Sequence, residues 1–129
     1  MDVTLVEKTA ELGGNLRKLR YLLGGENPAA KLDDLIKKLE SRANVKIMKN
    51  SEISKIDGSW GNFDTEIVSA GGASRVKHGV FVVATGANEY RPKEYEYGKD
   101  SRVLTQLELE DKLSKGDFKA SSVIMIPVS

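Results

Sequence analysis

The sequence Val3-Thr-Leu-Val-Glu7-Lys8, with the pair Gly13-Gly14 shortly after it, sets the prediction of the fold. A short apolar run rich in β-branched residues predicts a buried strand, here Val3 to Val6. An acidic residue at the end of such a strand is typical of a sheet that presents a carboxylate to the hydroxyls of a ribose. In the full dinucleotide-binding fingerprint, a glycine-rich turn lies roughly 20 residues before that acid. The sequence before Glu7 has no room for this turn, so we expect the chain to begin inside a domain.

Composition narrows the classes of function. The chain has 129 residues, which favours a single domain, and its 20 basic and 19 acidic residues leave a net charge of +1. This balance gives no electrostatic attraction to nucleic acid, and no apolar run is long enough for membrane insertion. With no cysteine and one histidine, the chain itself can hold no disulfide, cysteine-ligated iron–sulfur cluster or histidine-rich metal site. The cytoplasm is the expected compartment.

The first half of the chain predicts alternating strands and helices. Leucines at helical spacing predict a helix from Glu11 to Leu23, and Asn27-Pro28 predicts the start of a second helix that ends at Asn44. Period-two patterns then predict one long or two short strands over 45–56, broken near Asn50-Ser51. A turn at Asp57-Gly58 leads to a strand over 63–67, and a loose turn at Ala70 to Ala73 leads to an antiparallel strand over 75–78.

The second half predicts a buried strand at Val80-Phe-Val-Val-Ala84, because a continuous apolar run is typical of a strand covered on both faces. A polar, tyrosine-rich loop follows over 88–100. Thr105-Gln-Leu-Glu108 matches a capping box and predicts a helix to about Ser114. A last apolar strand is predicted over 122–128. The order of elements indicates an α/β fold with an antiparallel insertion.

Three places are candidates for a ligand site, each with a structural alternative. Glu7 would accept ribose hydroxyls with Lys8 near a phosphate, or both would be solvated side chains beside a turn. Gly13-Gly14 would admit a ligand close to the backbone, or would allow tight packing of a helix on a strand. Ala84-Thr85-Gly86 would let a cofactor lie at the carboxyl edge of the sheet, or would be an ordinary turn. His78 and the basic residues 17–20 are interpreted as solvated surface.

Four segments together resemble a known family. They are Val-Thr-Leu-Val-Glu-Lys from residue 3, Glu-Leu-Gly-Gly-Asn from residue 11, Gly-Val-Phe-Val-Val-Ala-Thr-Gly-Ala-Asn-Glu-Tyr from residue 79, and Arg-Val-Leu-Thr-Gln-Leu-Glu-Leu-Glu from residue 102. They resemble the flavoprotein A subunit of heterodisulfide reductase, which is of the FAD-dependent pyridine-nucleotide–disulfide reductase type. The resemblance runs across nearly the whole chain, and the loop before Val103 is its most particular part.

The resemblance implies a partial Rossmann-like FAD/NAD(P)-binding domain over 1–129, with a parallel sheet, flanking helices and an inserted antiparallel β-sheet. The first strand and the glycine-rich turn of such a domain are absent from the sequence. FAD is the implied cofactor of the parent protein. The resemblance places the adenosine ribose at Glu7 and Lys8, the pyrophosphate at Gly13 and Gly14, adenine on the backbone of Glu52 and Ile53, and the rest of the cofactor along Ala84, Thr85 and Gly86. It implies no catalytic side chain and no metal ligand in this chain.

The function implied by the resemblance is that of the FAD-binding portion of an oxidoreductase subunit, which relays electrons through flavin to partner subunits that carry iron–sulfur clusters. Without the phosphate-binding turn, we expect this piece to be inactive alone and tight FAD binding to belong to the parent. A non-catalytic scaffold or interaction fragment is the alternative, and an NAD(P)-binding domain is a further one. An exposed sheet edge would also favour self-association.

Overall fold

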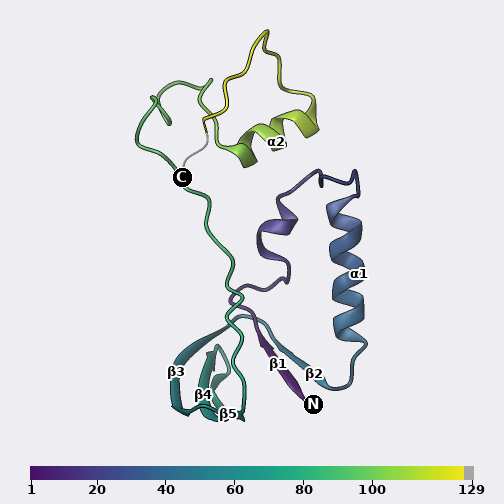
Figure 1. Cartoon of the computed structure of the whole chain (residues 1–129), viewed down its shortest axis with the longest axis vertical. Coiled ribbons are helices and arrows are strands. Elements are labelled where there is room, and N and C mark those ends of the chain that lie inside the picture. Colours follow the sequence, from purple (N-terminus) through teal and green to yellow (C-terminus); the bar gives the residue numbers. More distant parts are fainter. Residues whose placement is uncertain (127–129) are drawn as a thin grey trace.

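The protein is described by a computed structural model over residues 1–126, which shows a mixed α/β chain (Figure 1). The strands form a parallel pair and a separate antiparallel sheet of three. The elements in chain order are β1 (Val3–Val6), the 3-10 helix η1 (Gly14–Arg17), α1 (Pro28–Glu40), β2 (Val45–Met48), β3 (Ser51–Ser59), β4 (Asn62–Ser69), β5 (Gly72–His78) and α2 (Gln106–Lys115).

The first unit is a strand, a helix and a parallel strand. β1 pairs with β2 in the register Val3 to Val45, and α1 makes the crossover between them, as parallel strands require. The Asn27 side chain accepts hydrogen bonds from the N–H groups of Ala29 and Ala30, so the predicted cap is confirmed. The helix ends at Glu40 rather than at Asn44, and Leu32 on its inner face is buried.

The second unit is the meander β3-β4-β5, which confirms the predicted antiparallel strands. Its central strand β4 carries the best-buried side chain, Ile67. The predicted turn at Asp57-Gly58 is wrong, because β3 continues to Ser59 and the turn is at Trp60-Gly61. Gly58 has φ +103 and lies against the backbone of Asn62, where a side chain would not fit. This glycine marks a tight hairpin approach rather than the turn itself.

The two sheets meet at the end of β1. The Glu7 N–H donates to the Met48 carbonyl at 2.9 Å, and the Glu7 carbonyl accepts from the Ser51 N–H at 3.0 Å. Asn50, whose φ is +50, donates its N–H to the Thr9 carbonyl at 3.0 Å. The main chain around Glu7 is therefore fixed between the end of β2 and the start of β3, and Figure 1 shows both sheets diverging from this junction.

The predicted helix from Glu11 to Leu23 is wrong. Only η1 is helical in this segment, since Gly13 and Gly14 both have positive φ, at +113 and +46. Leu12 is nonetheless buried, and η1 packs on α1. Of the leucines at helical spacing, Leu12 is buried and Leu23 is fully exposed, and the positive φ of the two glycines limits the helix to one short turn.

The predicted strand at Val80 to Ala84 is also wrong. These residues form no strand and leave the meander as an open trace that leads to the region holding α2 (Figure 1). The apolar run at 122–126 likewise forms no strand, and 127–128 of that prediction lie outside the described residues. In both runs the side chains are exposed, because no neighbouring strand in the described chain takes up their backbone hydrogen bonds.

The predicted helix after Thr105 is confirmed as α2. Its capping box is complete: the Thr105 hydroxyl accepts from the Glu108 N–H at 3.3 Å, and the Glu108 carboxylate accepts from the Thr105 N–H at 3.0 Å. Glu110 accepts hydrogen bonds from the N–H groups of Arg20 and Tyr21, so this region is tied to the chain after η1. Neither described helix has the length and apolar character that crossing a bilayer demands.

Candidate functional site

A shallow, open depression of about 450 Å³ lies beside the junction of the two sheets. Its lining consists of Lys8, which follows Glu7, of Asn50, which precedes β3, and of residues at the paired ends of β3 and β4. The lining residues are Lys8, Asn50, Glu52, Ile53, Ser54, Val68 and Ser69. Three of the candidates from the sequence, Lys8, Glu52 and Ile53, are thus brought together, and Glu7 adjoins them through its carbonyl bond to Ser51.

The depression combines apolar and polar groups. Ile53 on β3 and Val68 on β4 are 38% and 41% exposed, so they offer apolar surface to a ligand. Lys8 and Glu52 form an ion pair at 3.2 Å on its rim. A concave apolar surface with a few polar groups beside it is the usual make-up of a small-molecule site. These side chains can bind and orient a ligand, and none of them is arranged for nucleophilic attack.

One edge of β3 is open along the depression. β3 pairs with β4 on one side, and the register shifts between Ile53 and Lys55, which leaves Ser54 as a bulge. Beyond the Ser51–Glu7 bond, no strand of the described chain pairs with the other edge. Main-chain N–H and C=O groups at such an edge can recognise the polar rim of a planar ring.

The Glu7 carboxylate is oriented by Thr9. Its Oε1 accepts from both the N–H and the hydroxyl of Thr9, each at 2.8 Å. The two hydrogen bonds from Thr9 lower the pKa of Glu7 below its usual value, and the bond from the N–H has the larger effect. The carboxyl group is therefore an anion at neutral pH. Both bonds from Thr9 end on Oε1, which leaves Oε2 able to accept a hydrogen bond from a ligand.

The two glycines of the pair have different roles. A Cβ on Gly13 would lie 2.6 Å from Cδ2 of Leu32, so Gly13 is required by close packing on α1. A Cβ on Gly14 would meet nothing within 4 Å. Close packing therefore accounts for Gly13, whereas there is open space around the position of a Cβ on Gly14. Neither glycine lines the depression.

Ala84, Thr85 and Gly86 are exposed and belong to no strand. The residue that follows them is tied to the first unit, because the Asn15 side-chain amide donates to the Ala87 carbonyl at 2.6 Å. This bond joins the Glu-Leu-Gly-Gly-Asn segment to the Ala-Thr-Gly-Ala segment across 72 residues. The three residues therefore lie beside η1 and outside the lining of the depression.

Sequence reasoning missed four residues that shape this region. Thr9 orients Glu7, Asn50 lines the depression with a left-handed backbone, and Asn15 holds Ala87. His78 is half-buried rather than solvated, because its ring nitrogens lie 2.7 Å from the Thr65 hydroxyl and 2.9 Å from the Val80 carbonyl. The threonine two residues after the acid was the one available signal, since such a side chain commonly bonds locally.

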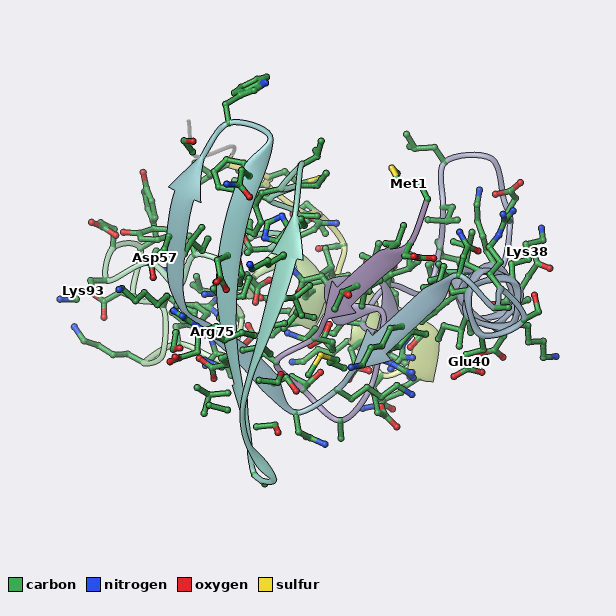
Figure 2. All side chains as sticks on the ribbon, turned by 90° about the horizontal axis from the view of Figure 1, so that it is seen from below. Met1, Lys38, Glu40, Asp57, Arg75 and Lys93 are labelled. Atoms are coloured by element: carbon green, nitrogen blue, oxygen red, sulfur yellow. The ribbon has the colours of Figure 1, made fainter. Side chains whose placement is uncertain are left out.

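The basic residues 17, 18 and 20 are exposed, as predicted, and two of them form ion pairs. Arg20 pairs with Asp111 of α2 at 3.3 Å, and Arg17 pairs with Glu11 at 3.4 Å. On the meander, Asp57 of β3 and Arg75 of β5 face one another across β4, as Figure 2 shows, with 3.2 Å between their charged atoms. Arg17, Arg20 and Arg75 are thus each paired with an acidic side chain of the same chain.

Comparison with known structures supports the fold. Over 68% of its length, the chain matches part of the crystal structure of L-proline dehydrogenase from P. horikoshii, with a TM-score of 0.60 and 21% sequence identity. The match covers 18% of that chain, so the present chain spans less than a fifth of that protein's length. No protein-family model and no curated protein sequence matches the chain. A parallel strand pair followed by an antiparallel sheet is therefore an arrangement that a dehydrogenase also contains.

Proposed function

We propose that the chain is the FAD-binding portion of an oxidoreductase subunit, and that its depression receives the adenosine end of the cofactor. One observation carries the proposal: the carboxylate of Glu7, oriented by Thr9, follows a parallel strand and precedes Lys8, which lines an open, partly apolar depression. In α/β sheets, ligands bind at the carboxyl ends of parallel strands, and an acid in this place holds the ribose hydroxyls of a dinucleotide.

The residues fit the adenosine half of the cofactor. Glu7 would accept a ribose hydroxyl on Oε2 while Thr9 holds Oε1. Val68, which pairs with Glu52 and therefore shares its face of the sheet, would contact one face of adenine, and the main chain of Glu52 and Ile53 at the open edge of β3 would meet the polar edge of the ring. Ala84 to Gly86 and the neighbouring Gly14 would border the remaining part of the cofactor. The flavin would supply the redox chemistry, and the protein would bind and position it.

The resemblance to the heterodisulfide reductase A subunit supports the finer part of the proposal. In that setting the parent would pass electrons from flavin to partner subunits with iron–sulfur clusters, in the cytoplasm. The cysteine-free sequence assigns those clusters to other polypeptides or domains. The structural similarity to a dehydrogenase agrees with an oxidoreductase, and it does not distinguish the heterodisulfide reductase type from other oxidoreductases.

Calorimetric titration with ADP and FAD tests the proposal. Glu7→Gln keeps an oxygen for Thr9 and removes the charge that favours the ribose, so it should weaken ADP binding about tenfold. Glu26→Gln removes an exposed carboxylate before α1, which pairs with Lys31, and should leave binding unchanged. Equal affinities of wild type and Glu7→Gln would contradict the assigned role of Glu7.

A scaffold without a ligand is the competing function, and the packing role of Gly13 is the observation that favours it. A scaffold predicts that neither ADP nor FAD produces any heat of binding with a folded chain. NAD is the third possibility, and it shares the adenosine diphosphate part with FAD. Tighter binding of FAD than of NAD is the result that our proposal expects.

A further inference from the structure

The chain exposes far more surface than a folded monomer of its size. Its accessible surface is 10411 Å² for a mass of 14.1 kDa. Folded monomeric proteins of this mass expose about 6,700 Å². The chain thus exposes roughly half as much again as expected, and this excess needs a partner surface to cover it.

Much of the exposed surface is apolar and belongs to two continuous runs. Val80, Phe81, Val82 and Val83 are 74%, 40%, 77% and 70% exposed, and the run from Val123 to Ile126 is exposed to a similar degree. Contiguous apolar patches of more than a few hundred Å² are rare on monomers and mark interaction sites. Both runs are rich in β-branched residues, which fit a strand.

β1 has an edge that can accept a strand. The N–H groups of Val3 and Glu7 donate to the carbonyls of Asn44, just before β2, and of Met48, at its end. Because main-chain groups alternate in direction along a parallel strand, those of Thr4 and Val6 point to the opposite edge. In the described residues no strand pairs with that edge, since the parallel sheet consists of β1 and β2 alone.

We propose that two copies of this chain form a two-fold symmetric dimer, in which Val80–Ala84 of each copy adds as a strand to the free edge of β1 in the other. Strand addition to an exposed edge is a common mode of association, in which main-chain bonds give affinity and side chains give specificity. The pairing is self-complementary, because each copy supplies one edge and one strand, and two-fold interfaces require this.

The area available suits such a dimer. Obligate homodimers bury about 2,000–5,000 Å² in total and have apolar interfaces. The surface that two copies expose beyond the area expected for folded monomers is larger than the area that such an interface buries. The net charge of +1 adds little repulsion between copies. Pairing would also order the segment that leads into Ala84, Thr85 and Gly86.

Sedimentation equilibrium of the full chain over a range of concentrations tests the dimer. Val82→Lys would bury an unpaired charge, and Thr4→Pro would remove an N–H at the free edge while leaving the bonds to β2 intact. Each should raise the dissociation constant by at least about tenfold. Leu23→Lys adds the same charge at a fully exposed leucine outside both surfaces and should leave the dimer intact.

Far-UV circular dichroism of each variant shows whether its fold is kept. A wild-type mass of one chain at all concentrations would overturn the proposal, as would open-ended association, because the reciprocal pairing closes at two copies. Dimerisation equal to that of wild type in folded Val82→Lys and Thr4→Pro would place the interface elsewhere. None of these outcomes depends on nucleotide binding, so they test the dimer separately from the proposed function.

Discussion

The ammonium of Lys8 lies 3.2 Å from a carboxylate oxygen of Glu52, across the rim of the depression beside Glu7. The pair joins the second residue after β1 to the second residue of β3. Glu52 cancels the one cation next to Glu7, so the rim carries a net negative charge. Such a rim disfavours a ribose that bears a 2′-phosphate and is compatible with the free hydroxyls of FAD or NAD.

Glu52→Gln should therefore improve binding of a 2′-phosphorylated nucleotide relative to ADP. Both partners are exposed, and exposed ion pairs contribute about 0–1 kcal/mol, so the affinity ratio should change by at most about fivefold. Titration with 2′,5′-ADP and ADP measures this ratio. The double variant Lys8→Met, Glu52→Gln is the control and should lose the gain. An unchanged ratio in Glu52→Gln would show that the ion pair has no role in discrimination.

Gly13→Ala should destabilise the fold even without a ligand. The new methyl group would overlap with Leu32, and overpacking of this kind typically costs about 1–3 kcal/mol. Gly14→Ala is the matched variant, since Gly14 also has positive φ but open space around it, and the left-handed backbone alone costs about 1–2 kcal/mol. Urea unfolding followed by circular dichroism compares the two. A smaller loss for Gly13→Ala than for Gly14→Ala would contradict the packing role.

Thr105→Ala should shorten or fray α2. It removes the hydroxyl that accepts the Glu108 N–H, and loss of such a cap costs about 1 kcal/mol. Thr105→Ser keeps the hydroxyl and should behave as wild type. Amide hydrogen exchange at Leu107 to Leu109 reports the opening of the first turn. Equal exchange rates in wild type and Thr105→Ala would mean that the capping box does not stabilise the helix.

Asp100 should show the strongest pH dependence in the loop before α2. Hydrogen bonds from the Arg102 guanidinium, and then from its N–H, lower the pKa of Asp100 from 3.8 to about 2. A depressed pKa in the folded state stabilises the fold above pH 3.8, and this contribution is lost as the pH falls toward 2. In Arg102→Met the pKa should return toward 3.8, as followed by carbon NMR of the carboxyl group.

Lys99→Met is the control for that titration, because Lys99 pairs with Glu96 rather than with Asp100. It should leave the Asp100 pKa low. An Asp100 pKa in Arg102→Met as low as in the wild type would show that the Arg102 side chain does not lower it. The N–H of residue 102 remains in both variants, so a part of the shift should persist.

Local signals predicted most of the elements correctly. The Asn27-Pro28 cap and the Thr105 capping box identify helix starts because the side chains that satisfy free N–H groups lie within a few residues. The period-two patterns of β3, β4 and β5 identify the meander because its strands pair with their neighbours along the chain. For the site, the family resemblance implied that Lys8, Glu52 and Ile53 border one cofactor; these residues line one depression, and their role in binding stays a prediction.

The errors arise where the outcome depends on distant partners or on backbone geometry. Val80 to Ala84 has the composition of a buried strand, but composition does not show which strand would lie next to it, and within residues 1–126 no strand pairs with this run. The leucines after Glu11 have helical spacing, yet positive φ at Gly13 and Gly14 limits the helix to one short turn. The hydrogen bonds of Thr9 and Asn15 depend on the path of the folded chain, which no local pattern reveals.

Amide chemical-shift mapping during an ADP titration tests the central claim most directly. We predict that shifts cluster at Glu7, Lys8 and Ser51 to Ile53, with smaller changes at Ser69, and that FAD adds shifts at Gly14 and Ala84 to Gly86. Shifts confined to other surfaces, or a folded chain whose spectrum does not change with either ligand, would contradict an adenosine site at the end of β1.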